Sequence, residues 1–346
     1  PFKDKVYMSN LCQEITLPTK PIQHIDDTEG EIALCILSAV NLGLIRDKED
    51  LEELCDLSVR ALDEIIDYQE YPVEAARIST ESRRSLGVGY IGLAHFLAKN
   101  HVKYDGKEAL MLVDEVTEAF QYYLLKASNT LAQEKGKCEY FDRTKYSDGI
   151  LPIDTYKKDL DKIVKRKLSY DWKQLRKDIQ EHGLRHSTLS MPSESSSVVS
   201  NATNGIEPPR DYLSIKKSKK GTLKQIVPDY YRLKNFYTLL WDMGGNAGYI
   251  HIVATMQKYF DQAISGNWSY NPENYPDREV PLSVMANDLL TTYKLGWKTS
   301  YYQNTYDAKQ DIDEPVHTIG WRDNVKEEPL LEIVEDDQEE CEACAI

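Results

Sequence analysis

Two apolar runs, each followed by a long amphipathic stretch, constrain the fold of this chain more than any other feature. Residues 31–42 form a short apolar run typical of a buried parallel strand. Over residues 47–66 apolar side chains recur at helical spacing, with Cys55 on the stripe that we expect to be buried. The pattern repeats as a strand or turn that feeds a helix at residues 87–97, and as a second long helix at residues 110–131. Alternating strands and helices predict an α/β fold.

Composition narrows the class of protein. The net charge of −15 and the pI near 5.0 repel phosphate backbones, so we expect no nucleic-acid partner, although a local site can still bind a nucleotide. The sequence has no apolar run of about 18 residues and no signal-peptide pattern at its start, which predicts no membrane association and a cytoplasmic location. Six cysteines are too few for a secreted disulfide scaffold, which leaves packing, ligand or redox roles.

The organisation along the chain suggests that a domain is entered midway. A dense polar motif follows Pro1 within nine residues, and we interpret the chain as a fragment, a processed product or half of a split subunit. Residues 139–186 are polar and rich in Lys and Tyr, as in a small subdomain, and a helix from Pro281 and a strand over residues 298–305 resume the core pattern. Residues 327–342 carry nine acidic side chains and no basic one, which predicts a disordered tail.

An amide, a thiol and a carboxylate alternate in Asn10, Cys12 and Glu14. In an extended segment residues i, i+2 and i+4 point the same way, so all three groups would face one small ligand. Such a set can orient one hydroxyl, accept a proton from another and supply a sulfur for redox or radical chemistry. From spacing alone a polar loop with a buried structural cysteine is the more common outcome, because Cys is often buried.

Three further motifs are each ambiguous alone. The serine-rich stretch within residues 191–210 suits a helix N-terminus, which binds phosphate well but is often only a capped helix start. Cys341 and Cys344 can form a disulfide or half of a zinc site, and the lack of further ligands nearby favours a dithiol that shuttles electrons on a tether. Tyr301 and Tyr302 are adjacent, and a tyrosine pair usually serves packing.

Taken together, the motifs resemble the C-terminal half of the large, catalytic subunit of class I ribonucleotide reductases, which reduces ribonucleoside diphosphates to deoxyribonucleotides. In the family's order, the chain has Asn10-Leu-Cys-Gln-Glu14, Gly30-Glu-Ile-Ala-Leu-Cys35, Pro192-Ser-Glu-Ser-Ser196, Asn204-Gly-Ile-Glu-Pro-Pro-Arg210, Met256-Gln-Lys, Asp261-Gln-Ala-Ile-Ser265, Tyr301-Tyr-Gln-Asn-Thr305 and a cysteine-bearing tail. So many matches in order outweigh the structural readings of the single motifs.

The resemblance implies a role for each catalytic residue. Cys12 would become a transient thiyl radical that takes the hydrogen from the ribose 3′ carbon. Glu14 would act as the base on the 3′ hydroxyl, and Asn10 would hold ribose hydroxyls while the 2′ group leaves as water. Cys35 would be one of two thiols that reduce the substrate and end as a disulfide. Its partner cysteine belongs to the family's preceding half, which this chain lacks.

The resemblance also implies partners and no directly bound cofactor or metal. Tyr301 and Tyr302 would relay the radical from a separate small subunit that holds a tyrosyl radical and a di-iron centre. Cys341 and Cys344 would reduce the active-site disulfide and be regenerated by thioredoxin or glutaredoxin. The substrate diphosphate would be bound by Pro192, Ser193, Glu194, Ser195 and Ser196. Cys55 and Cys138 match no catalytic position and are expected to pack.

The implied fold is the second half of a ten-stranded α/β barrel with the cysteine loop at its centre. We expect the cysteine loop and the start of the half-barrel in residues 1–138, a small αβ subdomain in 139–186, the remaining barrel in 187–321 and a disordered redox tail in 322–346. The N-terminal half of the subunit, with the effector sites, would be a separate partner. Cobalamin-dependent reductases and a noncatalytic binding fragment remain as alternatives, and the tyrosine pair favours class I.

Two positions depart from what the resemblance predicts. Tyr306 stands where we expect a basic residue. Lys216-Lys-Ser-Lys-Lys220 makes a basic segment that we expect to be a solvated loop. Neither departure touches a residue with a predicted catalytic role.

Overall fold

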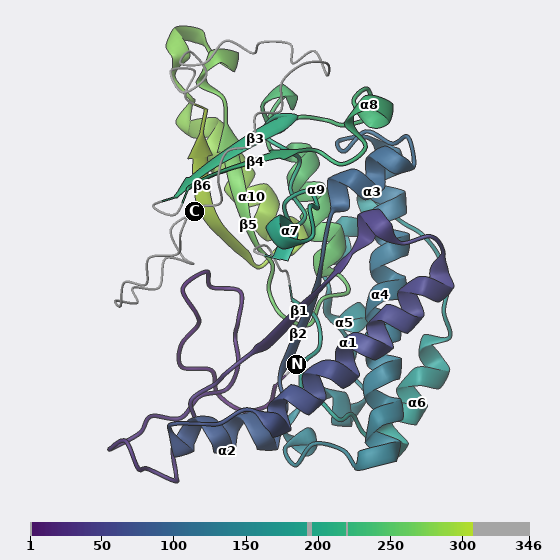
Figure 1. Cartoon of the computed structure of the whole chain (residues 1–346), viewed down its shortest axis with the longest axis vertical. Helices are drawn as coiled ribbons and strands as arrows, with labels where there is room; N and C mark the ends of the chain where they lie inside the picture. The colour runs from purple at the N-terminus through teal and green to yellow at the C-terminus, as the bar shows by residue number, and fades with distance from the viewer. Residues whose placement is uncertain (1, 192–195, 219–220, 307–346) are drawn as a thin grey trace, which may run out of the picture. The chain divides into compact units, whose positions relative to one another are not determined.

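The computed structural model describes residues 2–191, 196–218 and 221–306, and residues up to Tyr306 form one unit by their contacts (Figure 1). The strands are β1 (Ile36–Asn41), β2 (Leu86–Ile91), β3 (Leu213–Ser218), β4 (Gly221–Ile226), β5 (Ser265–Tyr270) and β6 (Thr299–Thr305). The helices are α1 (Lys48–Tyr68), α2 (Glu74–Arg83), α3 (Leu93–Lys99), α4 (Lys107–Lys135), α5 (Pro152–Thr155), α6 (Trp172–His182), α7 (Ser196–Val199), α8 (Tyr230–Leu233), α9 (Ala247–Gln257) and α10 (Leu282–Leu295). The mixed α/β content confirms the predicted class, and the predicted tail at 322–346 lies outside the described residues. The predicted boundaries at residues 138 and 186 stay predictions.

The first strand–helix unit confirms the pattern read from residues 31–131. β1 pairs in parallel with β2, and Val88 of β2 bridges in parallel to Ser190, so β2 lies between β1 and the segment around residue 190. The Asp47 side chain accepts the backbone N–H of Asp50 at 2.8 Å and caps α1. Cys55 is fully buried on the inner stripe of α1, which packs along α4 as Figure 1 shows.

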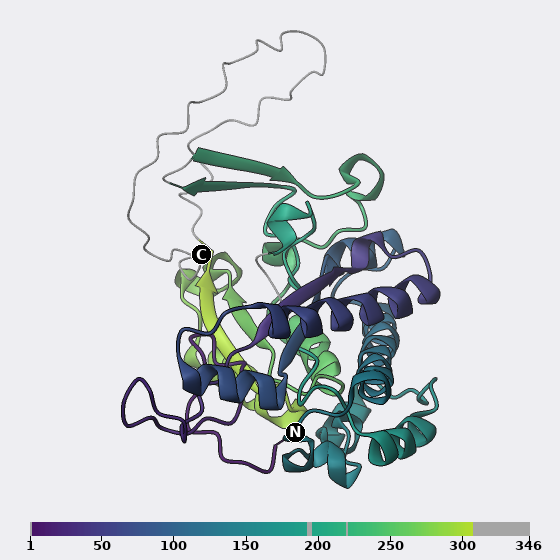
Figure 2. The same ribbon diagram turned by 60° about the horizontal axis from the view of Figure 1, so that its bottom comes forward.

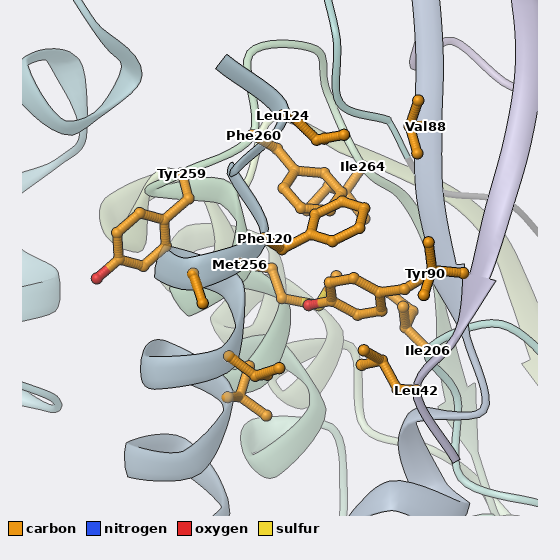
Figure 3. Packing of buried hydrophobic residues seen from close by; sticks show 14 of the residues in the cluster. Leu42, Val88, Tyr90, Phe120, Leu124, Ile206, Met256, Tyr259, Phe260 and Ile264 are labelled. Carbon is orange, nitrogen blue, oxygen red and sulfur yellow. The ribbon is translucent and has the colours of Figure 1, made fainter. Parts of the chain in front are cut away.

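The centre of the core joins β2, α4 and α9. The Tyr90 ring meets the edges of Phe120 and Phe260, with ring centroids 5.2 and 5.8 Å apart (Figure 3). The Tyr90 hydroxyl pairs with the Thr117 hydroxyl at 2.8 Å, so its polar end is satisfied. α9 is buried almost throughout, including Met256, because its sequence is apolar on every side. This core fixes the end of α9, from which the chain runs directly to the candidate site.

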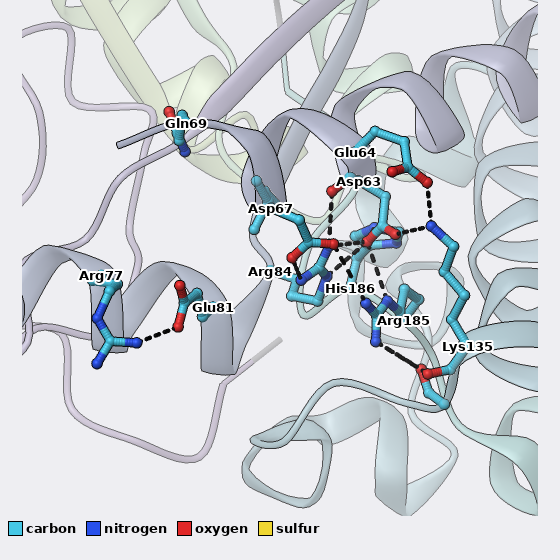
Figure 4. A network of polar contacts seen from close by, with 12 residues as sticks. Asp63, Glu64, Asp67, Gln69, Arg77, Glu81, Arg84, Lys135, Arg185 and His186 are labelled. Atoms are coloured by element: carbon cyan, nitrogen blue, oxygen red, sulfur yellow. Dashed lines mark hydrogen bonds and ion pairs between the residues drawn. The ribbon is translucent and has the colours of Figure 1, made fainter. Parts of the chain in front are cut away.

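A buried charge cluster ties α1 to the segment that enters the site. The Asp63 carboxylate, which has no exposed surface, accepts from Arg84 at 2.6 Å, from Arg185 at 3.2 Å and from Lys135 at 3.3 Å (Figure 4). Its Oδ1 also lies 3.2 Å from Nε2 of the buried His186. A buried carboxylate without partners is unfavourable. The three cations around Asp63 compensate its charge.

The second strand–helix unit is β5–α10–β6, in which β5 and β6 pair in parallel. It confirms the helix predicted from Pro281 and the strand predicted near residues 298–305. Leu282, Leu289 and Tyr293 of α10 are exposed, so these apolar side chains are not covered by other described residues.

The basic segment at residues 216–220 was predicted as a loop, and that prediction is wrong for residues 216–218. β3 and β4 form an antiparallel hairpin, which lies at one end of the unit in Figure 2. Leu213, Ile215 and Ile226, the apolar side chains of the hairpin that the structure describes, are all exposed. Exposed apolar positions of this kind mark no buried face in the sequence. No helix within the described residues is long and apolar enough to cross a membrane.

Candidate active site

Cys12 lies on a turn, and the predicted extended arrangement of residues 10–14 is wrong. The Gln13 backbone N–H donates to the Asn10 carbonyl at 3.1 Å, and Gln13 has a φ of 62°. A positive φ breaks the strand alternation on which the prediction relied. The turn nevertheless joins the predicted partners, because Asn10 Nδ2 donates to Glu14 Oε1 at 2.7 Å and Asn10 Oδ1 accepts the Ile15 N–H at 3.0 Å.

Glu14 keeps one oxygen available for a ligand. Its Oε2 is buried and has no hydrogen-bond partner among the described residues, while Oε1 is occupied by Asn10. A buried acceptor without a partner is unfavourable unless a ligand or water completes it. Cys12, two residues earlier, is partly exposed. The turn therefore presents a reachable thiol beside a carboxylate oxygen with free acceptor capacity.

Gln262 holds the Cys12 turn through hydrogen bonds to Thr16. The sequence had given Gln262 no role of its own. Gln262 Oε1 accepts both the backbone N–H of Thr16 at 2.8 Å and its hydroxyl at 3.2 Å. The Ala263 N–H donates to the Glu14 carbonyl at 3.1 Å. The turn is thus fixed on its C-terminal side by a side chain and a backbone group that follow α9.

Asp261 holds the segment that leads to the serine-rich stretch. Its carboxylate accepts the N–H groups of Leu189 at 2.9 Å and Ser190 at 3.2 Å, and the Tyr146 hydroxyl at 2.8 Å. Burial raises the pKa of Asp261, whereas these hydrogen bonds favour its charged form. We name Asp261, Gln262 and Ala263 the clasp, because together they hold residues 14–16 and 189–190. The signal for it was the Asp-Gln pair directly after a buried helix.

Cys35 precedes β1 and packs against the same segment. Its Sγ lies 3.3 Å from the Sδ of the buried Met191. Gly87 leaves room for this contact, since a Cβ there would lie 2.3 Å from Met191 Sδ. Burial, with the charges of Asp261 and Glu14, raises the pKa of the Cys35 thiol. Cys35 is therefore held as a neutral thiol, the form that donates hydrogen.

The tyrosine pair reaches the Cys12 turn from β6. The rings of Tyr301 and Tyr302 have centroids 4.0 Å apart. A hydrogen bond with Tyr302, followed by burial and by interaction with Cys12, raises the pKa of Tyr301. Thr299, at the start of β6, donates its hydroxyl to the Gln13 carbonyl at 3.2 Å. Tyr301 thus interacts with both Tyr302 and Cys12.

The remaining predicted residues are only partly described. The predicted helix after the serine-rich stretch is confirmed as α7, which begins at Ser196. Cys55 and Cys138 are buried in the core, as expected for packing residues, and burial raises the pKa of both thiols. Within the described ranges, no three His, Cys, Asp or Glu side chains are grouped to hold a metal ion. Outside the described residues lie Pro192, Ser193, Glu194, Ser195, Cys341 and Cys344.

A family model and several known proteins are similar to this chain. The family model described as ribonucleotide reductase, barrel domain, matches residues 1–303. The ribonucleoside-diphosphate reductase subunit alpha of Haemophilus influenzae is 60% identical over 311 residues, which cover 89% of this chain and 41% of that protein. The ribonucleoside-diphosphate reductase 1 subunit alpha of Escherichia coli is 53% identical over 311 residues, with the same two shares. The subunit alpha of Enterobacteria phage T4 is 43% identical over 322 residues, 91% of this chain and 42% of that protein. The chain spans about two fifths of these relatives.

Proposed function

The chain belongs to the ribonucleotide reductase family and has its barrel-domain fold, and from this premise we propose that it carries the catalytic centre of a class I ribonucleoside-diphosphate reductase. The reaction converts a ribonucleoside diphosphate and two thiols into a 2′-deoxyribonucleoside diphosphate, water and a disulfide. The described strands would belong to the second half of a ten-stranded barrel around the Cys12 turn. The observation that carries the proposal is the contact of Tyr301 with Cys12 on a turn closed by Asn10 and Glu14.

The radical enters through the tyrosine pair. A phenoxyl radical on Tyr301 takes one hydrogen atom, a proton with an electron, from the Cys12 thiol. Tyr301 becomes a phenol again and Cys12 a thiyl radical. The hydrogen bond between Tyr301 and Tyr302 supports the preceding step, in which a hydrogen atom passes between the two phenols. Shielding by the surrounding barrel would protect the thiyl radical from solvent.

The substrate steps use the groups around the turn. The Cys12 thiyl takes the hydrogen atom from the ribose 3′ carbon, and Glu14 Oε2, which is free to accept, takes the proton of the 3′ hydroxyl. The 2′ hydroxyl is protonated and leaves as water. Cys35 and a second thiol, from the polypeptide that supplies the first half-barrel, together supply two electrons and two protons and end as a disulfide. Glu14 then returns its proton to the 3′ oxygen, and Cys12 returns its hydrogen atom to the 3′ carbon, which regenerates the thiyl radical for return to Tyr301.

The substrate diphosphate would bind at Pro192, Ser193, Glu194, Ser195 and Ser196, at the start of α7. Backbone N–H groups and hydroxyls at a helix start favour a phosphate. The clasp supports this placement, because Asp261 holds residues 189–190, directly before the stretch.

Three partners complete the proposed enzyme. Within the described residues no strand pairs with the outer edge of β1, and Leu37, Tyr7 and Met8 are 53%, 63% and 68% exposed, which supports a partner polypeptide that supplies the first half of the barrel. A small subunit with a tyrosyl radical and a di-iron centre would supply the radical. Cys341 and Cys344 would carry electrons from thioredoxin or glutaredoxin to the Cys35 disulfide.

The proposal is tested by reconstitution. The chain is mixed with a polypeptide that supplies the first half-barrel and with a radical-bearing small subunit, and conversion of labelled ribonucleoside diphosphate is measured. Cys12→Ser is expected to abolish turnover, while Cys55→Ala, a cysteine change far from the turn, is expected to retain it. Full turnover by Cys12→Ser would refute the radical assignment.

The tail has a separate test in the same mixture. Replacing Cys341 and Cys344 by Ser is expected to spare turnover driven by dithiothreitol, which reduces the active-site disulfide directly. Turnover driven by thioredoxin is expected to be lost. Equal loss with both reductants would show that the two cysteines serve structure and carry no electrons.

A further inference from the structure

We propose that Asn267, oriented by Glu207, is a positioning residue that pins a bulge in β6 and so keeps the Tyr301 and Tyr302 rings in contact for radical transfer. The inference rests on the proposed function for the meaning of this ring contact. We call the hydrogen bond from the Tyr302 N–H to the Asn267 side chain the pin. Its existence follows from strand register and hydrogen bonds alone.

Adjacent residues of a regular strand cannot stack their side chains. Successive side chains point to opposite faces of a sheet, so Tyr301 and Tyr302 would lie on opposite sides of β6. Their ring centroids are instead 4.0 Å apart, with an interplanar angle of 52°. The backbone of β6 must therefore depart from regular pairing at this point.

The register of β5 and β6 contains that departure. Ser265 pairs with Thr299 and Gly266 with Ser300, but the next pair is Trp268 with Gln303, and the register shifts by one residue between them. On β5 only Asn267 lies in the interval, whereas β6 places both tyrosines there. Two residues opposite one define a β-bulge, which bends the strand and redirects side chains.

The side chain of Asn267 holds the bulge in place. A bulge removes a backbone group from the ladder, and Asn267 Oδ1 accepts the N–H of Tyr302 at 3.0 Å. Asn267 Nδ2 donates to Glu207 Oε1 at 2.7 Å. Because a carboxylate only accepts, Glu207 fixes which end of the amide faces Tyr302. The Glu207 N–H in turn donates to the Asn204 carbonyl at 3.1 Å, which anchors the carboxylate's own segment.

The pin has a consequence for transfer between the two phenols. A hydrogen atom passes only between oxygen atoms in direct contact, and the rate falls steeply when that contact opens. Without Asn267, the Tyr302 N–H loses its acceptor and β6 is free to return toward regular pairing. That return would carry the two rings toward opposite faces. Substrate binding, which lies with other segments, would be unaffected.

The pin is tested on the chain alone. 3-Fluorotyrosine is placed at position 302, and its ¹⁹F chemical shift reports the contact with the Tyr301 ring. Asn267→Ala is expected to move the signal to that of a solvent-exposed fluorotyrosine without this ring contact. Asn304→Ala, on the same strand, is the matched control and is expected to leave the signal unchanged. An unchanged signal in Asn267→Ala would overturn the pin.

A charge swap separates the pin from a general loss of structure. Asn267→Asp keeps an acceptor for Tyr302 but sets two carboxylates against each other, so the signal is expected to move. Adding Glu207→Gln restores a donor toward position 267 and is expected to return the signal to its original position. Failure of the double variant to recover would overturn the role of Glu207.

The relay is tested in the reconstituted enzyme. Asn267→Ala is expected to lower kcat at least tenfold while KM for the ribonucleoside diphosphate changes less than twofold, and the double variant is expected to recover kcat. A moved ¹⁹F signal with unchanged kcat would overturn the positioning role. If the unaltered mixture shows no turnover, the proposed function fails and the relay with it, while the ¹⁹F shift still decides the pin.

Discussion

Acidification is expected to destabilise the chain through one histidine. His186 has no exposed surface, and its Nδ1 pairs with the Ser128 hydroxyl at 2.9 Å while Nε2 lies 3.2 Å from Asp63. Burial lowers the pKa of His186 from 6.5 to about 4. A neighbouring carboxylate normally raises the pKa of a histidine, but Asp63 is already shared by Arg84, Arg185 and Lys135, so burial prevails.

The sign and size follow from this pKa difference. The unfolded chain binds a proton on the histidine near pH 6.5 and the folded chain only near pH 4, so the stability is complete above pH 6.5 and is lost as pH falls toward 4. The full loss is about 3 kcal/mol, of which about 2 kcal/mol falls between pH 7 and pH 5. Burial raises the pKa of Asp63, but His186 and Arg84 lower it to a greater extent, so Asp63 titrates below this window.

The assay is urea unfolding at pH 7 and pH 5 for the chain and for His186→Gln, which has no titrating group at this position. The difference in free energy of unfolding between the two proteins is expected to shrink by about 2 kcal/mol at the lower pH. In parallel, ¹³C-labelled histidine gives a resonance that is absent from the variant and reports the His186 titration directly. A midpoint near 6.5 for that resonance would refute the reasoning.

Three further outcomes are expected. Gly87→Ala puts a Cβ into Met191 and is expected to cost about 1–3 kcal/mol in urea unfolding, and a neutral result would contradict the close packing. Phe120→Ala removes a ring from the centre of the core and is expected to cost about 3–5 kcal/mol, whereas a loss under 1 kcal/mol would show that the site collapses around the change. Iodoacetamide followed by peptide mapping is expected to label Cys12 well before the buried Cys55, and equal rates would contradict the described exposure of the Cys12 turn.

Sequence patterns predicted the elements whose burial is periodic. α1 and α4 were expected near their observed positions because their apolar side chains recur at helical spacing, and β1 was expected because it lies in a short apolar run. The β3–β4 hairpin was missed, and its described apolar side chains, Leu213, Ile215 and Ile226, are exposed and so mark no buried face.

Local geometry at the site was less predictable. The turn at Cys12 depends on a positive φ at Gln13, and glutamine gives no signal for that conformation. The contact between the Tyr301 and Tyr302 rings depends on a register shift against β5, and the sequence of one strand does not show such a shift. The sequence motifs indicated which groups would react. The contacts that orient these groups can be seen only in the folded chain.

The clasp bears on the order in which the chain folds. Gln262 and Thr16 are 246 residues apart, and Asp261 meets Ser190 across 71 residues. Closing such long loops costs conformational entropy before the contacts at their ends can form. Contacts of this kind therefore form late in folding. During synthesis the Cys12 turn would emerge well before Gln262, which lies 246 residues after Thr16, and could be fixed only once that residue is available. The Cys12 thiol is thus expected to lack its active-site surroundings until the clasp has bound residues 14–16.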